Sequence, residues 1–310
     1  MTEKGNFLNS ILRPTIILLL FLSSLTSFAG EIALTFDDAP RPSGKYFSGT
    51  ERANQLVKSL SKAGVSQVAF FCNSVRLDSE GRERLLLYAK QGHVLANHSH
   101  SHPDIRSTTV SEYIKDIQNG HDQLSSLPNY QKLFRFPFLQ EGSNETDRDT
   151  VRKYLKNQGY RNGYVTVDTY DWYIDGILQK AVEKKMKIHT DRLCSAYAEI
   201  LWDGIQFYDQ VGQSVLKRSP KHVLLLHEND LAALCVSDLV EFVRKQGWKI
   251  ISPAEAYSDP IASVEPKTLY LNQGQIAAIA KDKRFSGPLV TKWENAHEID
   301  AEFSRRKVFE

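Results

Sequence analysis

The stretch Val223-Leu-Leu-Leu-His227 decides the fold class, because it is a short apolar run of buried-strand type with a polar end. A helical pattern over 231–246, Gly247 and the short run Lys249-Ile-Ile251 follow it. The same alternation precedes it, with strand-like runs at 31–36, 68–72, 93–97 and 164–167, and helical patterns at 51–63, 81–91, 110–127, 145–158, 176–187 and 196–218. This alternation predicts βαβ units, a mainly parallel sheet and an α/β fold. We favour a barrel or partial barrel over an open sheet.

Composition and charge narrow the class of protein further. The chain has 310 residues, of which 41% are hydrophobic and 25% charged, as in an ordinary soluble globular protein. Its net charge is +2 and no basic run forms a patch, which argues against a nucleic-acid partner. Residues 258–310 break the strand–helix rhythm and are predicted to be a polar C-terminal extension with one helical piece near 274–281.

The first 29 residues have the organisation of an export signal. A polar segment with Lys4 and Arg13 precedes the apolar run 15–22, and Ser27 and Ala29 form a small-x-small cleavage site. The alternative is an uncleaved anchor, but a spanning helix needs about 20 apolar residues and this run is shorter. We therefore expect residues 1–29 to be a signal peptide, a mature chain without stable membrane insertion, and a periplasmic or extracellular location.

The three cysteines are too few for a disulfide scaffold. Cys72, Cys194 and Cys235 show no CxxC spacing. In an exported chain they can form at most one internal disulfide, and we expect at least one thiol to remain buried.

A histidine cluster follows the third strand-like run. His98, His100 and His102 are three of the nine histidines, and they lie within five residues at a predicted strand end. Functional side chains in such folds lie at the carboxyl ends of strands. Two histidines and one carboxylate form a catalytic zinc set, although the same set also suits a non-haem iron oxygenase. The cluster therefore predicts a divalent metal site whose metal this pattern leaves open.

Two carboxylates end the first strand-like run. Asp37 and Asp38 are adjacent, so on an extended chain their side chains point to opposite sides. One can bind the metal while the other takes a proton. The sequence contains no motif of another catalytic mechanism, since it has no GxSxG elbow, HExxH helix, Walker loop or GxGxxG.

Together these segments resemble the polysaccharide deacetylases of carbohydrate esterase family four, the NodB-homology domain. Five segments match the family in order and span residues 35–227. They are Thr35-Phe-Asp-Asp-Ala-Pro40, His98-Ser-His-Ser-His102, Arg135-Phe-Pro-Phe138, Asp168-Thr-Tyr-Asp171-Trp172 and Val223-Leu-Leu-Leu-His227. The resemblance implies a distorted (β/α) barrel over residues 30–257, with residues 258–310 as an extension of unknown role.

The resemblance also implies a role for each matched residue. Asp37 would be the general base, oriented by Arg135, and His227 the general acid, tuned by Asp171. The metal, zinc or another divalent ion, would be held by Asp38, His98 and His102. Trp172 would wall the substrate groove, and the amide of Phe138 would help to hold the oxyanion.

The chain departs from the family pattern at two positions. Ala39 replaces the usual glycine, a change that fits if the backbone φ there is negative. Leu139 replaces a second glycine, in the loop that presents the Phe138 amide.

The sequence therefore predicts an exported, metal-dependent hydrolase that deacetylates an N-acetylated glycan, either peptidoglycan or a chitin-type oligosaccharide. An O-acetyl esterase acting on xylan or a similar glycan is the alternative, because the same site serves an ester and an amide. A non-catalytic glycan-binding protein is a third hypothesis, which the complete set of base, ligands and acid disfavours.

Overall fold

The computed structural model describes residues 1–2, 30–269 and 272–310, so all of the predicted signal peptide except its first two residues lies outside the described part of the chain. All the strand pairs within the sheet are parallel, and the strands run in the order β5-β4-β3-β2-β1-β6, with β7 also paired to β1. Their bounds are β1 Glu31–Ala39, β2 Ala69–Cys72, β3 Val94–Asn97, β4 Tyr130–Phe134, β5 Arg161–Asn162, β6 Lys221–His227 and β7 Lys249–Ile250.

One run of chain joins the two edges of this sheet. Residues 161–162 pair with β4, and five residues later Val167 bridges Leu224 of β6. The Thr166 N–H also donates to the Val223 carbonyl at 3.0 Å. The same run therefore contacts both edge strands, and the sheet closes into the distorted (β/α) barrel that the sequence predicted. Only the bridge at Val167 represents the strand expected over 164–167.

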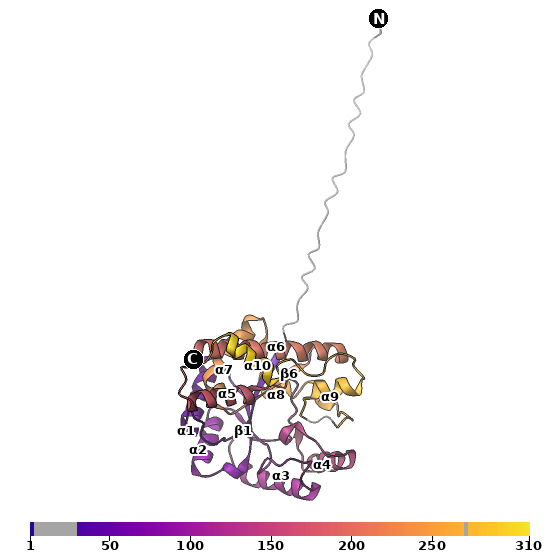
Figure 1. The fold of residues 1–310 in the computed structure, drawn as a ribbon. Coiled ribbons are helices and arrows are strands. Elements are labelled where there is room, and N and C mark those ends of the chain that lie inside the picture. Colours follow the sequence, from indigo (N-terminus) through magenta and orange to yellow (C-terminus); the bar gives the residue numbers. More distant parts are fainter. Residues whose placement is uncertain (3–29, 270–271) are drawn as a thin grey trace.

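Helices surround the strands, with α1 and α2 on one flank, α3 and α4 on another and α6 across a third (Figure 1). The helices of the barrel are α1 Gly49–Lys62, α2 Ser79–Lys90, α3 Val110–Leu124, α4 Glu145–Asn157, α5 Asp171–Glu183, α6 Thr190–Leu216, α7 Asp230–Lys245 and α8 Pro253–Ala256. Local chemistry fixes several starts: Ser48 and Glu51 form a capping box on α1, and the Asn229 side chain caps α7.

Several elements differ from the sequence prediction, among them α6, which begins at Thr190 rather than near residue 196. β4 was missed because Tyr130, Gln131 and Lys132 are not buried, so the strand lacks an apolar run. The helix predicted at 176–187 is α5, which begins five residues earlier at Asp171. The described part of the extension holds two α-helices rather than one, α9 Gln275–Asp282 and the short, polar α10 Ala296–Arg305, besides a 3-10 turn at Pro260–Ser263.

The core fills the barrel and the layer beneath its helices. The apolar side chains of β1, β2, β3 and β6 belong to one cluster with α1, α6 and α7. A smaller cluster of Ile105, Tyr113, Ile117, Phe134, Phe136, Val151, Leu155 and Tyr160 lies under α3 and α4. Cys194 of α6 and Cys235 of α7 form a disulfide, and Cys72 is a buried free thiol, which confirms the expectation of one bond at most.

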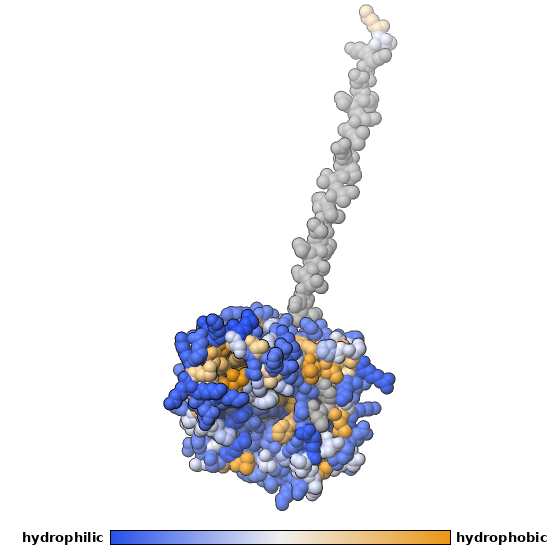
Figure 2. Space-filling model, viewed as in Figure 1, coloured by the Kyte–Doolittle hydropathy of each residue, from blue (hydrophilic) through white to orange (hydrophobic). Residues whose placement is uncertain are grey.

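The C-terminal extension packs back onto the barrel. The Gln275 N–H donates to the Val165 carbonyl at 2.7 Å, and the Trp293 indole donates to Asp203 of α6 at 3.0 Å. On the face seen in Figure 2, apolar residues form separate areas on a mainly hydrophilic surface. Among the described residues no helix has the length and apolar character needed to cross a bilayer.

Candidate active site

Three of the barrel strands carry the predicted site residues at their carboxyl ends. β1 and β6 are hydrogen-bonded neighbours in which Asp37 is the register partner of His227. β3 ends at Asn97, directly before His98. The parallel sheet therefore brings the first and last family motifs, 190 residues apart in sequence, to adjacent positions at one end of the barrel.

Asp37 is buried and paired with an equally buried arginine. Arg135 Nη1 lies 2.5 Å from Asp37 Oδ1 and donates to the Thr35 hydroxyl at 2.9 Å. Its Nε donates to the Gly163 carbonyl at 2.7 Å, and its Nη2 donates to the Tyr257 hydroxyl at 3.0 Å. With four partners holding the guanidinium, Asp37 is fixed in orientation and its negative charge is compensated.

Asp38, His98 and His102 form a ligand set beside that pair. One donor atom from each lies within 4.8 Å of the other two. The His98 Nδ1–H donates to the Arg135 carbonyl at 2.8 Å, which leaves its Nε2 lone pair directed at the carboxylates. His102 Nε2 lies 3.6 Å from Asp38 Oδ1. His100, the third histidine of the cluster, instead hydrogen-bonds Ser74 at 2.8 Å and lies outside the set.

The electrostatics of the set suit a cation. Burial would raise the pKa of Asp38, but His227, His102, His98 and Arg41 outweigh it and hold that pKa well below its usual range. Burial, reinforced by His98, lowers the pKa of His102 to about 4. The carboxylate is therefore ionised and the imidazole neutral near pH 7, which are the forms that bind a divalent metal.

His227 lies across from this set and is oriented by Asp171. Its Nδ1–H donates to Asp171 Oδ1 at 2.7 Å, and its backbone N–H donates to Oδ2 at 2.8 Å. The Asn229 amide donates to the same Oδ2 at 3.1 Å. Burial would lower the pKa of His227, but the charge and hydrogen bond of Asp171 raise it to about 9.

Two aromatic side chains border the site and remain about half exposed. Trp172, at the start of α5, is 48% exposed, and Phe138 is 47% exposed. The Phe138 ring stands edge-on to His102 with centroids 4.4 Å apart. Exposed aromatic faces at a polar cleft are suited to the apolar face of a sugar ring, whereas a core tryptophan would be buried.

All nine predicted site residues lie in or directly behind one cleft of about 690 Å³. Its walls include residues that the sequence did not single out, namely Arg41, Arg106, Gln140, Asn272 and Gln273. Asn272 and Gln273 come from the C-terminal extension, and Gln140 donates to Asn272 at 2.8 Å. No motif marks these positions, and the last two line the cleft because the extension packs onto the barrel.

The backbone explains the two departures from the family pattern. Ala39 is absent from the described residues with positive φ, so its Cβ is accommodated without strain. Phe138 and Leu139 have φ values of 55° and 53°, in the left-handed region that favours glycine. Leu139 therefore holds a conformation that a glycine would adopt freely, in the loop beside His102.

Comparison with known proteins finds a family match over the part of the chain that carries the Asp–Arg pair and the ligand set. Residues 27–163 match the family model described as polysaccharide deacetylase. The chain is 33% identical over 108 residues to a peptidoglycan-N-acetylmuramic acid deacetylase of Bacillus subtilis (strain 168), which covers 34% of this chain and 21% of that protein. It is 28% identical over 147 residues to a peptidoglycan-N-acetylglucosamine deacetylase of Bacillus cereus, covering 46% of each.

Solved structures support the same fold. A crystal structure of a peptidoglycan N-acetylglucosamine deacetylase superposes with a TM-score of 0.50 at 20% identity, and covers 74% of this chain and 88% of that chain. The chain matches less than half the length of the two curated relatives. The family match includes Asp37, Asp38, His98, His102 and Arg135, and ends before Asp171 and His227.

Proposed function

Because residues 27–163 belong to the polysaccharide deacetylase family, we propose that the chain is an exported, metal-dependent hydrolase that removes acetyl groups from an N-acetylated glycan. Peptidoglycan is the first candidate polymer, since both curated relatives are named as peptidoglycan deacetylases, and chitin-type oligosaccharides are the second. One observation carries the proposal: a buried Asp–Arg pair, a two-histidine one-carboxylate set and an Asp–His pair face one cleft.

Asp38, His98 and His102 would hold the divalent ion. Their donor atoms are close enough to share one cation, and the orientation of His98 is set by the Arg135 carbonyl behind it. Two histidines and a carboxylate form a catalytic zinc set, so zinc is the metal we propose. When bound there, it would lower the pKa of water to about 7 and polarise the acetyl carbonyl.

Asp37 is proposed as the general base. It lies on the strand beside the ligand set, with His98 Nε2 3.7 Å from its Oδ2, so that oxygen faces the place where water would be held. Arg135 engages the other oxygen, Oδ1. Because Arg135 binds Oδ1, Oδ2 remains available to take the proton as water attacks the acetyl carbon.

His227 is proposed as the general acid. Asp171 fixes the proton on Nδ1 and favours the imidazolium form, so Nε2–H can protonate the amine that leaves when the acetyl group is cleaved. The amide N–H of Phe138 would add a donor where the oxyanion develops, and Trp172 would stack on a sugar ring. The positive φ of Phe138 supports its role, because it sets the direction of that loop's peptide groups.

Export and the domain limits are part of the proposal. The Cys194–Cys235 disulfide supports export, since such bonds persist mainly in oxidising compartments. We propose residues 1–29 as the signal peptide, 30–257 as the catalytic domain, and 258–310 as an extension that completes a wall of the cleft through Asn272 and Gln273.

Acetate release from purified protein tests the function directly. We expect release from N-acetylated peptidoglycan fragments or chitooligosaccharides, its loss on treatment with a chelator, and its recovery with zinc. Acetylated xylan in parallel tests the O-acetyl esterase alternative. Glycan binding with no acetate released from any substrate, at full metal loading, would instead identify a binding protein.

The pH profile tests the role of the Asp171–His227 pair. Because the pKa of His227 is raised to about 9, its acid form persists at neutral pH and kcat should fall as the pH rises through about 9. Asp171→Asn removes the charge that raises this pKa, and burial then lowers it. The alkaline limb should therefore move to lower pH, measured as kcat against pH. An alkaline limb of the kcat profile that stays near pH 9 would show that another group titrates there.

A further inference from the structure

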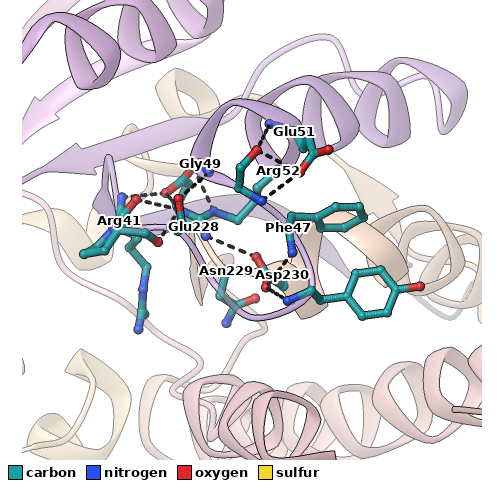
Figure 3. Close-up of polar contacts among 12 residues, drawn as sticks. Arg41, Phe47, Gly49, Glu51, Arg52, Glu228, Asn229 and Asp230 are labelled. Carbon is teal, nitrogen blue, oxygen red and sulfur yellow. Dashed lines mark hydrogen bonds and ion pairs between the residues drawn. The ribbon is translucent and has the colours of Figure 1, made fainter. Parts of the chain in front are cut away.

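The main chain of Arg41 is held by three buried, charged side chains. Its N–H donates to Glu228 Oε2 at 2.7 Å. Its carbonyl accepts from Arg52 Nη2 at 2.6 Å and from both Nη atoms of Arg84 at 2.9 Å. Figure 3 shows Glu228 and Arg52 beside Arg41 in the loop between β1 and α1. The position of Arg41 is therefore fixed more tightly than that of an ordinary loop residue.

The residues that hold Arg41 also form ion pairs and hydrogen bonds within their own buried network. Arg52 is 2% exposed and forms ion pairs with Glu228 at 3.3 Å and Asp230 at 3.1 Å. The Tyr88 hydroxyl donates to Glu228 Oε1 at 2.7 Å, and Asp230 accepts the backbone N–H groups of Tyr46 and Phe47 at 3.2 Å. These charges face inward, so the network supports the loop but does not itself contact a ligand in the cleft.

The guanidinium of Arg41, by contrast, lines the cleft and has capacity for a further partner. Its side chain is 30% exposed, and Nη1 lies 3.5 Å from Asp38 Oδ2, which is longer than the 2.7–2.9 Å typical of a charge-assisted hydrogen bond. Within residues 30–269 and 272–310, no acceptor meets hydrogen-bond geometry with this guanidinium. Its N–H donors therefore retain capacity for an acceptor bound in the cleft.

The other charges of the cleft are already balanced. Arg106 donates through Nε and Nη2 to both oxygens of Asp104, at 2.6–3.2 Å. Asp37 is neutralised by Arg135. Asp38 belongs to the proposed ligand set, so a cation bound there would claim the charge that now faces Arg41. The guanidinium of Arg41 would then have no carboxylate of the cleft paired with it.

We propose that Arg41 is a specificity residue that binds a carboxylate carried by the glycan substrate. The planar guanidinium matches a carboxylate with two parallel hydrogen bonds, and a clamped backbone reduces the ordering cost of binding. The inference rests on the proposed deacetylase function and deepens it. It selects glycans with a carboxylate on or next to the N-acetylated sugar, such as muramic acid or uronic acid units, over neutral chitin-type chains.

A matched pair of substrates tests this inference. One is an N-acetylated oligosaccharide with a muramic carboxylate, the other the same oligosaccharide with that carboxylate amidated; a uronic acid analogue distinguishes the two sources of carboxylate. We expect the unmodified protein to prefer the carboxylate form in kcat/KM, and Arg41→Gln to reduce that preference about tenfold. Arg41→Lys should restore part of the preference, since lysine keeps the positive charge but lacks the planar guanidinium that donates two parallel hydrogen bonds. Arg106→Gln is the matched control and should leave the preference unchanged.

Equilibrium binding separates this inference from the proposed function. Calorimetry with the deacetylated forms of both oligosaccharides needs no turnover, and should show tighter binding of the carboxylate form that Arg41→Gln abolishes. Equal binding and equal kcat/KM for the two forms would overturn the role of Arg41 while leaving acetate release intact. Selective binding without acetate release would instead support Arg41 and contradict the proposed reaction.

Discussion

Asp37→Asn should lower acetate release by about 10²–10⁴-fold, the range expected for loss of a general base. The amide keeps the size of the side chain but accepts no proton. Asp38, His98 and His102 are unchanged, so metal content should stay at that of the unmodified protein. Steady-state acetate release and metal analysis on the same preparation provide the two measurements.

Two comparisons make this result specific to Asp37. Asp168 is a third carboxylate of the same cleft, beside Asp37 and Asp38, and burial followed by Glu294 raises its pKa, which makes it a poor candidate for an ionised base. Asp168→Asn should therefore cost much less activity than Asp37→Asn. Asp37→Asn also leaves Arg135 unpaired, so a melting curve must accompany it. A folded, metal-loaded Asp37→Asn protein with unreduced turnover would remove Asp37 from the mechanism.

Arg52→Met should cost about 3–5 kcal/mol of folding free energy, because it leaves buried carboxylates without their cation. Glu228 is fully buried and Asp230 nearly so, and both are ion-paired to Arg52. Urea unfolding of the oxidised protein measures the loss. An exposed pair is expected to contribute about 0–1 kcal/mol, so Arg106→Met, which breaks the pair with Asp104, is the control.

A double variant distinguishes charge from packing at Arg52. If the cost comes from an uncompensated charge, Arg52→Met combined with Glu228→Gln should lose less stability than the two single changes added together. Additive losses would indicate that Arg52 acts through packing of its aliphatic chain. A loss below about 1 kcal/mol for Arg52→Met alone would contradict the role given to the buried network.

The fold could be predicted where apolar runs are continuous and short. The run 223–227 and the helix after it were placed within two residues, because the strand is buried along most of its length and the helix has a continuous buried apolar face. β4 could not be found, since its first three residues are not buried and only Leu133 and Phe134 enter the core. The early start of α5 was also hidden, because Tyr170 provides no side-chain cap that would mark it.

The residues of the site can likewise be separated into those that local sequence pattern selects and those that it does not. Asp37, Asp38, His98 and His102 stand at predicted strand ends, so local pattern was enough to select them. The partners Arg135 and Asp171 are 98 and 56 residues from the groups they orient, and no local spacing connects them; the family resemblance supplied both. Arg41 follows the first motif directly but is not part of it, and the extension residues Asn272 and Gln273 belong to no motif and reach the cleft only through long-range packing.

The disulfide between α6 and α7 also indicates in which compartment each molecule folded. A chain that has folded in an oxidising compartment should present a single thiol, Cys72, to an alkylating reagent after denaturation, whereas a chain retained in the cytosol should present three. The mass added by alkylation in separate cell fractions therefore reports where a molecule matured. That measurement needs no substrate, no metal and no knowledge of the reaction.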